Sequence, residues 1–198
     1  MTDSTAGVKS STDKVAVVIG STRPTRICPE IAAWIRDVLQ EGSPLQYELL
    51  DLAEQKLPLL DEPLKAALRQ YQHDHTKRWS RTVDFYSGFL FVLPQYNWGY
   101  PAALKNALDY LYHEWSGKPA AVATYGTRGG GKGAAQLLQV LQGLHMRAVD
   151  DHLELVVTDA DVDENWQLID VGVTLRPYRE QVRGIDQQLV EAIKDDQL

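Results

Sequence analysis

The first stretch that could do chemistry is residues 20–26 (GSTRPTR), which directly follow five apolar residues at 15–19 (VAVVI). Three hydroxyl side chains and two arginines fall within it, and Pro29 suits the first turn of a following helix. Arginine holds phosphate oxygens with two parallel hydrogen bonds, and the free N–H groups at a helix start favour an anion. The pattern predicts a phosphate-binding turn between a strand and a helix. An ordinary turn with solvated arginines is the alternative.

A second candidate stretch, residues 94–101 (PQYNWGYP), follows the apolar run 88–93. Its prolines and Gly99 fix an irregular backbone, which leaves N–H and C=O groups free to face a ligand. Tyr96, Trp98 and Tyr100 offer flat surfaces that suit a flat ring. The stretch therefore predicts a ring-binding loop, and aromatic side chains that only cap the core are the alternative.

The third candidate stretch is residues 125–133 (YGTRGGGKG), after the predicted strand 118–124. Residues 126–132 match the first seven positions of a P-loop, but Gly133 stands where Ser or Thr would bind Mg²⁺. We favour a backbone-donor loop, because three consecutive glycines let N–H groups approach a carbonyl-bearing ring edge. The start of the next helix supports negative charge there. A P-loop nucleotide-binding protein is the weaker alternative.

Other familiar site patterns do not occur in the sequence. There is no G-x-S-x-G nucleophile elbow, and no G-x-G-x-x-G follows the first strand. His73 and His75 have no cysteine partners, so no metal site is predicted. Cys28 lies at a helix start, but a Cys-dependent phosphatase would need Arg where Trp34 stands, so we interpret Cys28 as a packing residue. We therefore predict no catalytic side chain.

The elements that would position these stretches alternate between strand and helix, which predicts an α/β protein with a parallel sheet covered on both faces. In such a sheet the loops after the strands meet at one edge, so the three candidate stretches should converge. Strands are predicted at residues 15–19, 47–52, 88–93 and 118–124, with an interrupted fifth at 147–149 and 153–157. Helices are predicted at 29–40, 64–83, 102–115, from 133 to about 144, and from about 177.

Composition sets further limits. The length of 198 residues suits one domain, predicted at 14–198 behind a flexible polar tail at 1–13. A formal net charge of −7 argues against nonspecific nucleic-acid binding. The apolar runs are too short to span a membrane, and no signal-peptide core is visible, so a cytoplasmic protein is expected. Predicted helix 102–115 has apolar residues on more than one face, which suggests a subunit contact.

A ligand with one terminal phosphate, a flexible polar linker and a flat ring with a carbonyl-bearing edge would fit all three stretches. Flavin mononucleotide (FMN) has that shape. Its phosphate would meet Ser21, Arg23 and Arg26, its ring would lie along residues 95–98, and its pyrimidine edge would face residues 125–129.

The same motifs also resemble a known family. GSTRPTR, P-x-YN-x-G-x-P-x-x-LKNALD and YG-x-x-GG are similar to those of the NAD(P)H-dependent FMN reductases, including quinone- and azo-reducing members, over roughly residues 14–149. The resemblance implies a flavodoxin-like fold, with a five-stranded parallel sheet, tightly bound FMN and a homodimer. It also implies hydride transfer from NADPH or NADH through flavin N5 to a small-molecule acceptor: a quinone, an azo compound, free flavin or a ferric complex. A non-enzymatic flavodoxin-type electron carrier is the alternative.

The resemblance also implies cofactor-binding residues. The phosphate would be bound by Ser21, Arg23 and Arg26, with help from Thr22, Ile27 and Cys28. The ring would be lined by Pro94, Gln95, Tyr96, Asn97 and Trp98, and its pyrimidine side by Tyr125, Gly126, Thr127, Gly129 and Gly130. The sequence departs from the usual family pattern at Gln95, where Glu is common, and at Trp98, which is bulkier. No motif is visible after residue 150.

Overall fold

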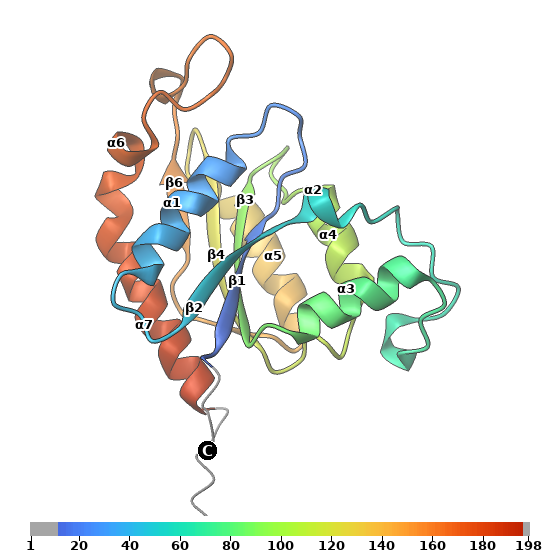
Figure 1. Ribbon diagram of the computed structural model, residues 1–198. Helices are drawn as coiled ribbons and strands as arrows, with labels where there is room; N and C mark the ends of the chain where they lie inside the picture. The colour runs from blue at the N-terminus through green and yellow to red at the C-terminus, as the bar shows by residue number, and fades with distance from the viewer. Residues whose placement is uncertain (1–11, 196–198) are drawn as a thin grey trace, which may run out of the picture.

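A parallel sheet with helices on both faces forms the centre of the computed structural model, which describes residues 12–195 (Figure 1). The strand order is β2-β1-β3-β4-β5, and β6 also pairs with β4, further along that strand than β5. The predicted flavodoxin-like sheet, with its interrupted fifth position, is therefore confirmed. The strands are β1 (Lys14–Ile19), β2 (Gln46–Asp51), β3 (Gly88–Pro94), β4 (Pro119–Gly126), β5 (Arg147–Ala148) and β6 (Leu153–Val156).

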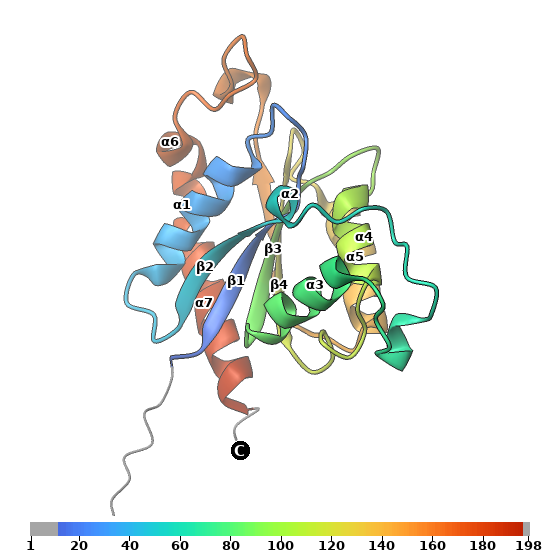
Figure 2. The same cartoon turned by 45° about the vertical axis from the view of Figure 1, so that its right-hand side comes forward.

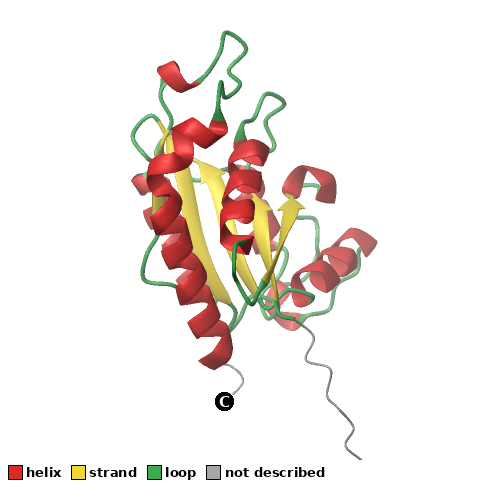
Figure 3. Ribbon diagram, turned by 60° about the vertical axis from the view of Figure 1, so that its left-hand side comes forward, coloured by secondary structure: helices red, strands yellow, loops and turns green. Residues whose placement is uncertain are grey.

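The helices divide between the two faces of the sheet (Figures 2 and 3). One face is covered by α1 (Cys28–Gln40), α6 (Val171–Leu175) and α7 (Arg179–Asp195), and the other by α3 (Asp74–Asp84), α4 (Ala102–Asp109) and α5 (Gly131–Gly143). The short helix α2 (Leu52–Gln55) follows β2 directly, and 3-10 turns lie at η1 (Ala66–Leu68), η2 (Asp159–Asp161) and η3 (Arg176–Tyr178). Among the described residues, no helix is long and apolar enough to cross a bilayer.

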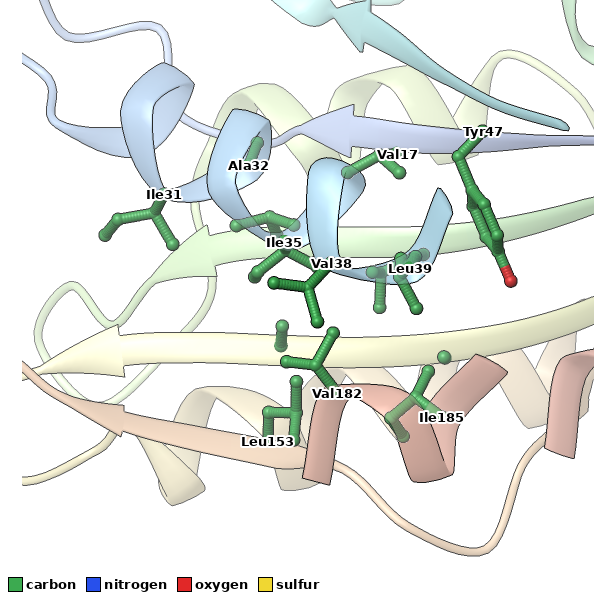
Figure 4. Packing of buried hydrophobic residues seen from close by; sticks show 14 of the residues in the cluster. Val17, Ile31, Ala32, Ile35, Val38, Leu39, Tyr47, Leu153, Val182 and Ile185 are labelled. Atoms are coloured by element: carbon green, nitrogen blue, oxygen red, sulfur yellow. The ribbon is translucent and has the colours of Figure 1, made fainter. Parts of the chain in front are cut away.

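The central strands are apolar because both of their faces are buried. All seven residues of β3 are buried, and successive residues enter opposite cores. On the α1 face, Ile35 and Val38 pack with Val182 and Ile185 of α7 (Figure 4). These contacts hold α1 against α7 and the sheet, and Cys28 and Ile31 near the start of the helix belong to the same core.

The tail predicted at residues 1–13 falls mostly outside the described residues. Residues 1–11 lie outside the described residues, but Asp13 is already part of the fold. Its carbonyl oxygen accepts a hydrogen bond from the Gln46 N–H at 2.9 Å, and its carboxylate accepts one from Ser87 Oγ at 2.7 Å.

The predicted helix at residues 64–83 is wrong in its first half. That part contains only the turn η1, and Arg69 adopts a left-handed conformation (φ 54°) that ends it. The Glu62 carboxylate accepts hydrogen bonds from the N–H groups of Gln72 and His73, immediately before α3 begins at Asp74. These tertiary hydrogen bonds replace the helical ones that the spacing of apolar residues had suggested.

The predicted helix at residues 102–115 is also too long, because α4 ends at Asp109. Tyr110, Leu111 and Trp115 are buried by this chain itself. The Trp115 ring lies edge-on to Phe89, with centroids 5.0 Å apart, and its Nε1–H donates to the Leu108 carbonyl at 3.1 Å. The apolar surplus of this segment therefore gives no evidence for a subunit contact.

Glu114 binds the irregular segment that precedes α3 through hydrogen bonds and an ion pair. Its buried carboxylate accepts hydrogen bonds from Ser80 Oγ at 2.7 Å and Tyr71 Oη at 3.0 Å, and it pairs with Arg69 at 3.3 Å. Burial raises the pKa of Glu114, but the hydrogen bonds from Ser80 and Tyr71 and the charge of Arg69 outweigh it. The pKa of Glu114 therefore lies below its ordinary value of 4.5.

We expect Glu114→Gln to lower the free energy of unfolding by about 2 kcal/mol at pH 7, because charge-assisted hydrogen bonds are lost. A lowered pKa in the folded state stabilises the protein above the unfolded-state pKa, and this contribution disappears as pH falls through the folded-state pKa. The difference between the two proteins should therefore shrink below about pH 4.5. Urea unfolding between pH 3.5 and 7 measures it, and a difference that is constant with pH would contradict this account.

Candidate functional site

The loops after β1, β3 and β4 meet above the carboxyl edge of the sheet, at the top of Figure 1. Together they line one pocket, as the strand order predicts. Of the residues predicted from sequence, the pocket brings together Arg23, Arg26, Ile27, Pro94, Gln95, Tyr96, Tyr125, Gly126 and Thr127. Ser21 and Cys28 lie buried behind it, and Asn97, Trp98, Gly129 and Gly130 are not among its lining residues.

The first loop begins with a close backbone approach. The Gly20 N–H donates to the Val92 carbonyl at 2.8 Å, and a Cβ at position 20 would lie only 2.9 Å from that oxygen. Ser21 is fully buried, and its Oγ lies 2.9 Å from Tyr96 Oη, within hydrogen-bond distance. The Ser21 hydroxyl therefore joins the first loop to the second.

The two arginines of the first loop have different surroundings. The Arg26 guanidinium is paired with both carboxylate oxygens of Asp51 at the end of β2, and it donates to the Ser21 carbonyl at 2.6 Å. Arg23 is exposed, with its guanidinium 5.9 Å from the centroid of the Tyr96 ring. Within residues 12–195 it forms no ion pair. Arg26 therefore holds the loop in place, whereas Arg23 remains available to an anion.

Helix α1 starts at the floor of the pocket with Ile27 as its N-cap, and no side chain from the described residues caps it. Such an end presents backbone N–H groups and a positive dipole to an anion. Burial raises the pKa of Cys28 to about 11, and its Sγ donates to the Val92 carbonyl at 3.3 Å. The Cys28 thiol is therefore a protonated packing group, as predicted, and only its backbone can serve a ligand.

The second loop is a two-residue turn. Tyr96 and Gly99 exchange backbone hydrogen bonds of 2.9 Å, and the two residues between them, Asn97 and Trp98, have φ angles of 47° and 69°. Positive φ at both positions is typical of a type I′ turn. A tryptophan rarely adopts this conformation, so the surrounding structure must hold it there.

Trp98 points away from the first pocket and lines a second one, which Gln95 shares. Its side chain is 69% exposed, and Lys132 Nζ lies 5.4 Å from the centroid of its ring. Arg128 also lines this second pocket. The residues predicted to line one ring are thus divided between two adjoining pockets.

Gln95 has a role that the sequence did not indicate. Its side-chain oxygen accepts a hydrogen bond from the Gly133 N–H at 3.1 Å, in the first turn of α5. This contact joins the second loop to the third, so Gln95 stabilises the arrangement of the loops that flank it.

The glycines of the third loop are required by close contacts. Gly129 and Gly130 have φ angles of 79° and 97°, and a Cβ at position 130 would lie 2.8 Å from the Cβ of Thr124. A Cβ at position 131 would lie 2.6 Å from the Glu154 carboxylate. By contrast, no neighbouring atom lies within 4 Å of a Cβ built at Gly126, so open space adjoins the backbone there.

The site predicted from the sequence did not include a fourth segment that lines the first pocket. Val157, Thr158, Asp159, Val162 and Trp166, which follow β6, also line the first pocket. The sequence after residue 150 has no motif that would have identified them. The only available signal was an isolated tryptophan in the polar stretch DVDENWQ.

Together these features fit a ligand with an anionic end and a flat ring. Arg23 and the uncapped start of α1 provide the anion site, Tyr96 and Tyr125 provide aromatic walls, and Gly126 leaves room for a ring edge. Burial raises the pKa of Tyr125, which lies within hydrogen-bond reach of Cys28, so its hydroxyl stays protonated.

Comparisons with known proteins identify a family that this sequence matches. Residues 14–159 match the family model described as NADPH-dependent FMN reductase. The NAD(P)H-dependent FMN reductase LOT6 of Saccharomyces cerevisiae is 45% identical over 147 residues, which cover 69% of this chain and 77% of the yeast protein. A quinone reductase of Pseudomonas putida is 32% identical over 115 residues, covering 56% of this chain and 58% of that protein.

A solved structure supports the fold. The flavoenzyme NAD(P)H:(acceptor) oxidoreductase FerB from Paracoccus denitrificans aligns with a TM-score of 0.68, covering 93% of this chain and 98% of that chain. Because the two chains are only 22% identical, this likeness shows the fold alone.

We expect Arg26→Ala to lower the free energy of unfolding by about 1–3 kcal/mol, because it leaves the mostly buried Asp51 carboxylate without its partner. The double variant Arg26→Ala/Asp51→Ala should cost less than the sum of the single changes. The matched control Arg23→Ala removes an exposed arginine of the same loop and should cost less than about 0.5 kcal/mol. Urea unfolding of the wild type, the double variant and the single variants Arg26→Ala, Asp51→Ala and Arg23→Ala measures these losses. Equal losses for the two arginines would contradict their different roles.

Proposed function

Because the chain belongs to the NADPH-dependent FMN reductase family, we propose that it is an NAD(P)H-dependent oxidoreductase that binds FMN in the pocket between its three loops. The observation that carries the proposal is the convergence of an anion site, aromatic walls and a glycine-lined gap in that one pocket. The acceptor is a small molecule such as a quinone, a class named for the Pseudomonas relative. The functional unit is a homodimer, by resemblance to the family.

The phosphate of FMN binds at the first loop. Arg23 contacts it directly, assisted by the backbone N–H groups of Ile27 and Cys28 at the start of α1. The exposed hydroxyl of Thr25, which lines the pocket, is available as a further donor, whereas Thr22 lines a different pocket beside α2 and α4. Ser21 and Arg26 support this site from behind, through their bonds to Tyr96 and Asp51.

The isoalloxazine ring lies between the second and third loops. Pro94, Gln95 and Tyr96 line one side, and Tyr125, Gly126 and Thr127 face the pyrimidine edge. FMN held by these residues would supply the two-electron chemistry that links NAD(P)H to the acceptor. Backbone N–H groups of the third-loop residues that line the pocket stabilise negative charge at the pyrimidine edge. No side-chain acid is needed for this step.

We expect the purified protein to bind added FMN and, under anaerobic conditions, to lose the flavin absorption band on addition of NADPH or NADH. A quinone added afterwards should restore the band. Absorption spectroscopy measures each step. A protein that binds FMN but stays oxidised with both coenzymes would instead be an electron carrier, and a protein that binds no FMN would contradict the assignment of all three loops.

We expect Arg23→Ala to raise the Kd for FMN by about 10- to 100-fold, because a charge-assisted hydrogen bond to phosphate is lost. The affinity for riboflavin, which has no phosphate, should stay within about twofold of wild type. Quenching of flavin fluorescence measures both constants. An equal loss of affinity for the two flavins would show that Arg23 contacts the ring or linker and not the phosphate.

A further inference from the structure

The segment at residues 157–168, between β6 and α6, is the part of the pocket wall that the family comparison mostly leaves out. It rises above the sheet edge near the first loop (Figure 1), and the family match ends at residue 159. The Val157 N–H donates to the Gly126 carbonyl at 3.0 Å, so the segment is attached directly to the third loop.

Local hydrogen bonds hold this segment in one shape. Val162 and Leu168 form an antiparallel bridge, and the Asp163 N–H donates to the Gln167 carbonyl at 2.8 Å. The Asp163 carboxylate also accepts hydrogen bonds from the N–H groups of Asn165 at 2.8 Å and Gln167 at 2.9 Å. The segment is therefore a tight hairpin with its own support.

The base of the hairpin is equally well fixed. The Asp161 carboxylate accepts hydrogen bonds from the N–H and hydroxyl of Thr158 at 2.8 and 2.7 Å, and from Thr174 Oγ1 at 3.1 Å. Val162 and Leu168 pack against the core on the α1 face. The tip of the hairpin is thus held in place relative to the pocket.

At the tip, Trp166 has two unfavourable features at once. Its φ angle is 60°, in the left-handed region that a bulky side chain rarely adopts, and its side chain is 62% exposed. Glycine would relieve both, since it adopts this conformation without strain and exposes no apolar surface. Strained backbone conformations cluster at ligand contacts, and Trp166 combines one with a place in the lining of the pocket.

The pocket shows what that contact would be. Trp166 lines the same pocket as Arg23, Tyr96 and Tyr125. The base of its hairpin is bonded to Gly126 of the third loop, the loop that the proposed function assigns to the flavin ring.

We propose that Trp166 is a binding residue for the flavin ring, an aromatic wall of the pocket beside those formed by the three loops. This inference rests on the proposed function. It assigns to Trp166 a contact with the isoalloxazine, so that the strain at position 166 is offset by cofactor affinity.

The test compares Trp166→Gly with Trp166→Phe and with the control Ile169→Ala. Ile169 is 67% exposed on the same side of the fold but does not line the pocket. We expect Trp166→Gly to raise the Kd for both FMN and riboflavin by about tenfold, the loss expected of one aromatic stacking contact, and Trp166→Phe by less than about threefold. Ile169→Ala should not change either constant.

The thermal midpoint of the flavin-free proteins is the second readout. Trp166→Gly should leave it unchanged or raise it, because the strained conformation suits glycine. A lowered midpoint, or wild-type flavin affinity in Trp166→Gly, would overturn the assignment while the proposed function stands. If the wild-type protein itself binds no flavin, the proposed function fails and this inference fails with it.

Discussion

The site depends on hydrogen bonds that join loops belonging to different strands. The parallel sheet delivers three loops to one edge, but it does not by itself fix their side chains relative to one another. Ser21 and Tyr96 join the first loop to the second, and the contact of Gln95 with the Gly133 N–H joins the second to the third. Because these contacts preform the pocket, few side chains or loops have to become ordered when a cofactor binds.

The same loops contain strained residues that the scaffold must hold. Trp98 and Trp166 both have positive φ angles and mostly exposed side chains, an arrangement that neither local propensity nor burial favours. Each is supported nearby: Gln136 donates to the Trp98 carbonyl at 3.2 Å, and Asp163 organises the turn around Trp166. Strain of this kind is commonly found at ligand contacts, where it is offset by stability elsewhere in the fold.

The fold and the three loops could be predicted from the sequence because their signals are local. An apolar run followed by glycine, arginine or aromatic residues identifies a strand end and its loop whatever the rest of the chain does. The errors occurred where distant residues decide the structure. Glu62 and Glu114 hold residues 64–73 out of the predicted helix. The 157–168 hairpin lies at the pocket because β6 pairs with β4 and because Val162 and Leu168 pack against the core.

The two arginines of the first loop show that the sequence can identify candidate anion-binding residues but cannot tell which of them is paired with a carboxylate. The sequence presents Arg23 and Arg26 as equivalent candidates for a phosphate, three positions apart. The fold brings Asp51 from β2 against Arg26 and leaves Arg23 exposed. Since Asp51 neutralises Arg26, the positive potential offered to a phosphate comes from Arg23 and the start of α1. Arg26, which also lines the pocket, ties the first loop to the end of β2, so a substitution there would affect the free energy of unfolding as well as any affinity.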